Sequence, residues 1–251
     1  MHEAFFFGPG RQRIFAHYHP AAARGGEVLT LICPPLFSEY MRTHMALRKL
    51  AVALAERGQH VLRLDYRGTG DSFGDLDEVG VSEWIADIEL SVQEGRDLSG
   101  SSAVQLVGVR AGALLACASM GASKHIRRFV LWDPVRDGAD YLLRLRRMQT
   151  DMLERNLYLS RAERAGAMVE HGGFRLSARM LEEFRLLDIH AYSKVPKSRL
   201  HIVNTSVAEG SPVQGVPQYV VPFSCNWELD IEEPIIPQPV LERLVACLTM
   251  S

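Results

Sequence analysis

One short segment combines residue types and a spacing that are typical of nucleophilic catalysis. Residues 104–115 read VQLVGVRAGALL, an apolar run that passes through Gly108-Val109-Arg110-Ala111-Gly112 into a helix-forming run. This is the strand-turn-helix context of the G-x-S-x-G nucleophile elbow, whose tight turn presents its central side chain at a helix N-terminus. The glycines leave room for such a turn. Here the central residue is Arg110, whose guanidinium stays protonated and is no nucleophile.

Two further motifs support the elbow interpretation. Asp65-Tyr66-Arg67-Gly68-Thr69-Gly70-Asp71-Ser72 resembles the D-x-R-G-x-G-x-S loop that often follows the fourth strand of α/β-hydrolases. Cys33-Pro34-Pro35-Leu36 stands where those proteins place the oxyanion loop after the third strand. In order and spacing the three motifs resemble an α/β-hydrolase over nearly the whole chain. The resemblance implies a mostly parallel central sheet with helices on both faces.

The chain is also similar to a narrower group, the exosortase A system-associated hydrolase 2 proteins. The similarity rests on four segments: Gly108–Ala116, Val130–Val135, Phe37–Met41 and Gly173–Ser177. That group carries an arginine in its elbow, in a G-L-R-x-G-A pattern, and is found in bacterial loci for exopolysaccharide production and PEP-CTERM protein sorting. Its chemistry is inferred from its fold alone. The chain departs from the group after the third strand, where it has Cys-Pro-Pro in place of His-Pro.

The remaining members of a serine triad are missing from their usual places. In α/β-hydrolases the order is nucleophile, acid, histidine, so the histidine should follow the final strand, near Ser224–Glu228. That segment contains no histidine, and the last of the 9 histidines is His201. Glu209 or Asp133 would be placed to serve as the acid, but neither has a histidine to orient. We therefore expect no serine-triad hydrolysis.

Other nucleophiles on the same rim have simpler explanations. Cys33 ends an apolar strand-like run and is interpreted as a small buried core residue. Ser38 and Ser72 lie in expected loops, and Ser72 fits a turn residue that bonds backbone. His44, the histidine expected nearest to the rim, is interpreted as a surface residue at the start of a helix.

An arginine at the elbow needs a compensating anion, because a helix N-terminus already presents partial positive charge. One solution is a carboxylate that pairs with Arg110 and plugs the site; Glu39, Asp65 and Asp133 are all expected at the carboxyl edge of the sheet, and Glu39 is the preferred partner. The other is an anionic ligand held by the guanidinium and the helix amides. The candidate ligand-binding residues are Arg110, Glu39, Phe37, Ala111 and Asp133.

Alternating apolar runs and helical patterns supply the elements that would position these residues. Strands are expected at Glu3–Phe7, Arg13–Tyr18, Val28–Cys33, His60–Asp65, Ala103–Val107, Arg128–Trp132, Leu200–Asn204 and Gln218–Val221. Helices are expected at Met45–Arg57, from an N-cap at Ser82 to Arg96, at Ala111–Met120 and at Pro239–Leu248. Residues 137–187 are expected to form a helical cap inserted into one domain spanning 1–251. Its Arg136–Arg155 segment either lines a cleft or is a solvated face with leucines inward; we favour the second.

Composition narrows the class of protein. The 251 residues carry a formal net charge of −2, which argues against a nucleic-acid-coating protein. No apolar run is long enough to span a membrane, and the N-terminus lacks the pattern of a secretory signal. The 4 cysteines form no CxxC pair, so we expect reduced thiols in a cytoplasmic protein with no metal and no cofactor. An exposed edge strand would allow a homodimer.

Two functions remain open at this point. In the first, the chain is a triad-less hydrolase-fold protein that binds an anionic small molecule, a lipid-linked intermediate or a protein partner in an exopolysaccharide or exosortase pathway. In the second, it is an active hydrolase or acyltransferase with rearranged groups around Arg110, in which Glu39 and Asp133 are the candidate catalytic residues.

Overall fold

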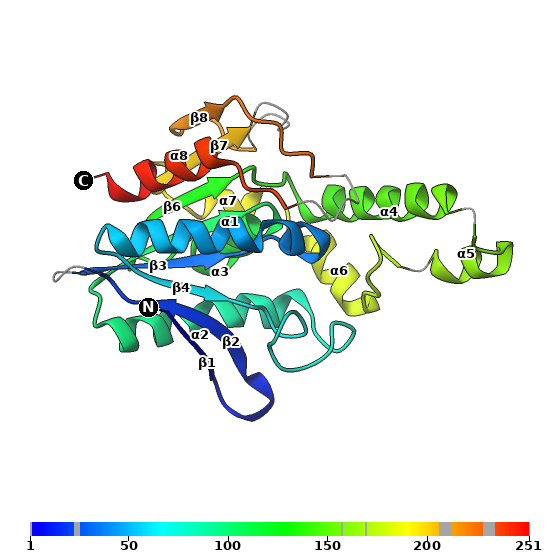
Figure 1. Ribbon diagram of the computed structural model, residues 1–251, viewed down its shortest axis with the longest axis horizontal. Coiled ribbons are helices and arrows are strands. Elements are labelled where there is room, and N and C mark those ends of the chain that lie inside the picture. Colours follow the sequence, from blue (N-terminus) through cyan, green and yellow to red (C-terminus); the bar gives the residue numbers. More distant parts are fainter. Residues whose placement is uncertain are drawn as a thin grey trace.

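An eight-stranded, mostly parallel sheet forms the centre of the molecule (Figure 1). The computed structural model describes residues 2–22, 26–156, 158–168, 170–205, 212–227 and 234–250. The strand order is β1-β2-β4-β3-β5-β6-β7-β8, with β1 and β2 antiparallel to their neighbours and the others parallel. The strands are β1 (Glu3–Phe7), β2 (Ile14–His19), β3 (Val28–Cys33), β4 (His60–Leu64), β5 (Ala103–Val109), β6 (Ile126–Trp132), β7 (Leu200–Thr205) and β8 (Gln218–Val221). All eight expected strands are confirmed to within two residues at either end.

The helices cover both faces of this sheet, as expected (Figure 1). They are α1 (Phe37–Glu56), α2 (Val81–Ser99), α3 (Ala111–Met120), α4 (Gly138–Arg155), α5 (Arg161–Ala167), α6 (Ala178–Leu186), α7 (His190–Ser193) and α8 (Gln238–Thr249), with short 3-10 turns at Gly10–Gln12 and Lys197–Arg199. Helices α1 and α8 pack with one face of the sheet into one apolar core, and α2 and α3 pack with the other face into a second core. The strands between two such layers are continuous apolar runs because both of their faces are buried.

Helix α1 begins at Phe37, eight residues before the expected start at Met45. The apolar spacing that predicts the helix covers only its later turns, which face the sheet. Its first two turns bury polar side chains, among them Glu39, Arg42 and Thr43. Apolar periodicity does not reveal a helix turn that faces a polar site. Ser38 was expected in a loop for this reason, but it lies on α1 together with Phe37 and Glu39.

Helix α2 also begins one residue before the predicted cap. Its N-cap is Gly80 and not Ser82, and the Glu83 carboxylate accepts a hydrogen bond of 2.8 Å from the Gly80 amide. The acidic residue in the first turn therefore accepts from the amide of the N-cap residue itself, and its negative charge is favourable at the helix N-terminus.

Helices α4 to α7 occupy the interval between β6 and β7 where the insertion was expected. Figure 1 shows α4 and α5 extending away from the carboxyl ends of the strands. Leu142 and Leu145 are buried on α4, while Arg146, Arg147 and Arg155 are exposed. The arginines thus form a solvated face, as favoured from the sequence; that the segment is a cap on a single domain stays a prediction.

The four cysteines are free and buried. In the described part of the chain, no helix has both the length and the hydropathy required to cross a bilayer.

His19 provides a pH-dependent contribution to stability. Its side chain is 2% exposed on β2, and burial, with the Arg63 guanidinium adding to the effect, lowers its pKa from 6.5 to about 4. A group whose folded pKa is depressed below its unfolded value favours the fold in its neutral form. The contribution of His19 to the free energy of unfolding is therefore fully present above pH 6.5 and is lost as the pH falls towards 4.

We expect the free energy of unfolding to fall by up to about 3 kcal/mol across that window because of His19. Urea denaturation at pH 7.5 and pH 4.5 measures the fall, which should be smaller in His19→Gln. The exposed His125 gives a matched control, since His125→Gln should retain the full fall. Equal pH dependence in wild type and His19→Gln would contradict the assignment.

Candidate functional site

Arg110 sits in the strained turn that the elbow interpretation requires. It lies between β5 and α3 with φ 53° and ψ −124°, a conformation that non-glycine residues rarely adopt. A Cβ on Gly112 would lie 2.1 Å from the Pro34 carbonyl oxygen, and a Cβ on Gly108 would lie 2.4 Å from the Ala113 Cα. Both glycines are thus required by close backbone approach, and the predicted elbow is confirmed.

Arg110 is only 8% exposed, and its guanidinium is held by protein groups. Its Nε donates to Glu39 Oε1 at 3.0 Å, and its Nη1 donates to the Asp133 carbonyl oxygen at 3.1 Å. The guanidinium carbon also lies 5.1 Å from the centre of the Trp227 ring, within range of a cation–π contact. The predicted pairing of Arg110 with Glu39 is confirmed.

Glu39 is held equally tightly. The carboxylate is near the N-terminus of α1, where the helix dipole favours negative charge. Its Oε2 accepts a hydrogen bond of 3.1 Å from the Tyr141 hydroxyl on α4, so both carboxylate oxygens are occupied. The first turn of α4 therefore closes the site by satisfying the second oxygen of the ion pair.

Burial and ion pairing shift the pKa values of Arg110 and Glu39 in opposite directions. Burial lowers the pKa of Arg110, but the Glu39 carboxylate more than offsets this, so the pKa of Arg110 is raised. Burial raises the pKa of Glu39, while the charge and hydrogen bond of Arg110 oppose that shift. The guanidinium therefore keeps its charge at neutral pH.

The Asp133 carboxylate is used for structure. Its Oδ1 accepts from the Thr205 amide at 2.7 Å, and its Oδ2 accepts from the Thr205 hydroxyl at 2.8 Å and from Trp227 Nε1 at 2.9 Å. Asp133 itself has φ 42° at the end of β6. The three donors tie the ends of β6 and β7 to the segment after β8.

Trp227 is a site residue that the sequence interpretation missed. It lies in the segment where a triad histidine was expected, contacts the elbow side chain with its ring and donates its N–H to an acid. An indole has this donor but has no acceptor for a proton. The signal that marks Trp227 in the sequence is its position after the last strand, where the fold places the catalytic histidine.

The other acidic residues considered from the sequence do not contact Arg110 or lie outside the described residues. Asp65 does not pair with Arg110; its carboxylate accepts from the Tyr40 hydroxyl and, at 3.1 Å, from the Asp71 amide. It follows β4, whereas the elbow follows β5, and β3 lies between those two strands. Glu209 lies outside the described residues, as does Glu228.

The alternative nucleophiles match their simpler interpretations. Cys33 is fully buried, and burial raises the pKa of its thiol to about 12. Ser72 bonds backbone on both sides, donating to the Asp65 carbonyl at 2.5 Å and accepting from the Phe15 amide at 2.8 Å. His44 is exposed on α1, although in the second turn of the helix.

The last two candidates start helices. Phe37 begins α1 with φ 55°, and Ala111 begins α3 directly after the elbow. Both side chains are buried, Ala111 completely, while Phe37 keeps 5% of its surface exposed. Among the described residues no group of three His, Cys, Asp or Glu side chains is arranged to hold a metal ion.

The ion pair should dominate the response of this site to mutation. Arg110→Met leaves the Glu39 carboxylate buried without its counter-charge, which typically costs about 3–5 kcal/mol. We expect the free energy of unfolding to fall by that amount in denaturant titration. The double variant Arg110→Met/Glu39→Leu should lose less than Arg110→Met alone, because no unpaired charge remains. An unchanged melting temperature of Arg110→Met would contradict the structural role of the pair.

Comparisons with solved structures agree with the fold described above. No protein-family model matches the sequence, and no curated protein matches it. A monoglyceride lipase variant from Saccharomyces cerevisiae is similar in structure, with a TM-score of 0.64 and 12% identity over 98% of this chain and 93% of that chain. The thioesterase domain of the curacin biosynthetic pathway gives 0.61 and 15% identity over 99% of this chain and 100% of that chain. XC6422 from Xanthomonas campestris, an α/β serine hydrolase without a lid, gives 0.54 and 12% identity over 98% and 89%. At these identities the likeness establishes the architecture: the chain has the α/β-hydrolase fold.

Proposed function

We propose that this protein uses the α/β-hydrolase fold for binding and not for serine-triad catalysis. Its ligand is an anionic small molecule or lipid-linked intermediate, and its place is a bacterial exopolysaccharide or exosortase pathway in the cytoplasm. The observation that carries the loss of triad catalysis is the elbow itself, where the buried Arg110–Glu39 ion pair stands in place of a nucleophile. The pathway is suggested by the resemblance to the exosortase A system-associated hydrolase 2 group.

The chemistry of the three central residues supports this proposal. Acyl transfer by a triad needs a nucleophile and a base that takes its proton. Arg110 supplies a permanent cation at the first position, and Trp227 supplies at the second an N–H group without a lone pair to accept a proton. Asp133, hydrogen-bonded to Trp227, orients an aromatic ring that has no acid–base role.

Rearranged catalysis by Glu39 or Asp133 is the competing function. A general acid or base must come within hydrogen-bond reach of the reacting group. Glu39 is 4% exposed and Asp133 is 1% exposed, and the oxygens of both carboxylates already accept hydrogen bonds from protein donors. A catalytic role would require breaking the pair that closes the site, so we favour the binding role.

Labelling and turnover test the loss of triad chemistry. Wild type should show neither stoichiometric labelling of a serine by a fluorophosphonate nor a burst with p-nitrophenyl esters. Arg110→Ser should restore the elbow serine and still show no turnover, because no histidine follows β8 in the described residues to activate it.

A serine esterase treated in parallel provides the positive control, and intact-protein mass spectrometry counts the labels. Stoichiometric labelling of any serine in wild type would point to a relocated nucleophile and would overturn the proposal. Appreciable turnover by Arg110→Ser would show that another base is in place.

A further inference from the structure

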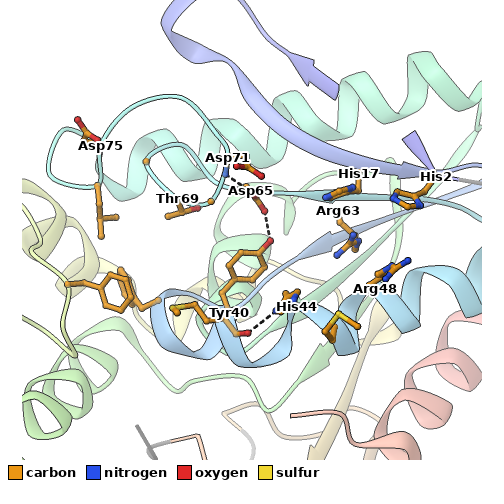
Figure 2. A pocket seen from close by; sticks show the side chains of 17 residues that line it. His2, His17, Tyr40, His44, Arg48, Arg63, Asp65, Thr69, Asp71 and Asp75 are labelled. Atoms are coloured by element: carbon orange, nitrogen blue, oxygen red, sulfur yellow. Dashed lines mark hydrogen bonds between the residues drawn. The ribbon is translucent and has the colours of Figure 1, made fainter. Parts of the chain in front are cut away.

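A cavity of about 1120 Å3 lies beside the closed elbow, between α1, the strands β2 and β4, and the loop after β4 (Figure 2). Of the five ligand-binding residues predicted from the sequence, only Phe37 lines it. The volume is slightly above the usual range of small-molecule sites, about 300–1,000 Å³. None of the interactions that hold Arg110 uses the polar groups of this cavity.

One end of the cavity gathers cationic and imidazole side chains. Tyr40, His44 and Arg48 follow one another at four-residue spacing on α1, so they share a helix face. Across from them His17 on β2 and Arg63 on β4 are partners in the antiparallel register, which places both side chains on the same face of the sheet. Figure 2 shows Arg48, Arg63 and His17 gathered at this end.

The charges at this end are not balanced by the protein. Neither Arg48 nor Arg63 forms an ion pair with any described residue, and the buried Nε of Arg63 and Nδ1 of His17 have no hydrogen-bond partner there. Burial lowers the pKa of Arg63; Tyr40 and the Asp65 carboxylate oppose this shift, and repulsion by Arg48 adds to it. A buried donor without a partner costs free energy, so this end of the cavity is a polar region that the described residues leave unsatisfied.

Nearby carboxylates do not take this role. Asp65 is committed to the Tyr40 hydroxyl and the Asp71 amide. Asp71 and Asp75 are exposed on the loop after β4 and line the cavity there. An anion is thus attracted to the Arg48–Arg63 end and repelled by this loop, so it has one favoured orientation.

The opposite end is apolar. Phe37 and Phe174 pack with ring centres 5.1 Å apart, and both line the cavity together with Leu76 and Met41. Met41 is 66% exposed, which leaves apolar surface for a ligand to cover. Phe37 and Arg48 are separated by eleven positions on α1, which corresponds to about 16 Å along the helix axis. The cavity therefore runs from an apolar end to a cationic end over the length of an amphiphile.

We infer that this cavity binds an alkyl or prenyl phosphate, with the phosphate between Arg48 and Arg63 and the hydrocarbon chain against Phe37, Leu76 and Phe174. A phosphate fits better than a carboxylate or sulfate because two guanidinium groups balance a dianion and its several acceptor oxygens. The inference deepens the proposed function by naming a ligand class, and places that ligand beside the elbow and not on Arg110. It does not depend on the loss of catalysis.

Isothermal titration calorimetry with octyl phosphate below its micelle concentration tests the inference. Inorganic phosphate and octyl glucoside should both bind more weakly, because each satisfies only one end of the cavity. Affinity should rise about fourfold per buried methylene from butyl to octyl phosphate. Octyl sulfate, with a single charge, should bind more weakly than octyl phosphate.

Substitutions at the cationic end separate this site from a nonspecific surface. Arg63→Gln and Arg48→Gln should each weaken octyl phosphate binding by about 10- to 100-fold. Neither should lower the melting temperature of the unliganded protein, because neither guanidinium has an ion-pair partner among the described residues. Lys49→Gln, one residue further along α1 and facing α8, is the matched control and should bind as wild type does.

The inference would be overturned by inorganic phosphate binding as tightly as octyl phosphate, by octyl glucoside doing so, or by full affinity in Arg63→Gln and Arg48→Gln. Serine labelling in the fluorophosphonate experiment would overturn the proposed function and leave this titration unaffected. Failure of the wild-type protein to bind octyl phosphate would overturn this inference and leave the labelling result unaffected. The two failures are therefore distinguishable.

Discussion

A cation at the N-terminus of a buried helix must be balanced by an anion, and Arg110 meets this constraint through Glu39. The pair occupies the elbow. The second oxygen of the Glu39 carboxylate accepts a hydrogen bond from the Tyr141 hydroxyl on α4. The start of α1, the elbow and the first turn of α4 are thus joined by one buried carboxylate. Removing either charge would leave the other unpaired in a site with almost no access to water.

Backbone strain accompanies this network. The three non-glycine residues with positive φ in the described chain are Phe37, Arg110 and Asp133, and each follows one of the neighbouring strands β3, β5 and β6. Phe37 starts the helix that carries Glu39, and Asp133 offers its carbonyl oxygen to Arg110. Unfavourable conformations of this kind persist only where surrounding contacts over-determine them. Here those contacts hold an ion pair in the place where catalytic members of this fold hold a reactive group.

Helix α1 serves two neighbouring regions because consecutive helical residues point about 100° apart. Glu39 faces the elbow and completes the ion pair, while Tyr40 faces the cavity and binds Asp65. The cavity thus borders the closed site through Phe37 yet has its own polar groups, Arg48 and Arg63. Closure of the elbow and binding beside it are compatible in one structure, since they use different faces of the same helix.

Local patterns in the sequence determined the strands, the elbow turn and the absence of a histidine after the last strand. Those features depend on apolar periodicity, on glycines that allow close approach and on residue identity, which are all readable along the chain. Which acid meets Arg110, what Trp227 does and how Arg48 comes to face Arg63 were decided by tertiary structure. These contacts join residues far apart in sequence, and the polar first turns of α1 carry no periodic signal. Burial against Tyr141 of α4 and Asp133 at the end of β6 is what makes Arg110 and Glu39 a site.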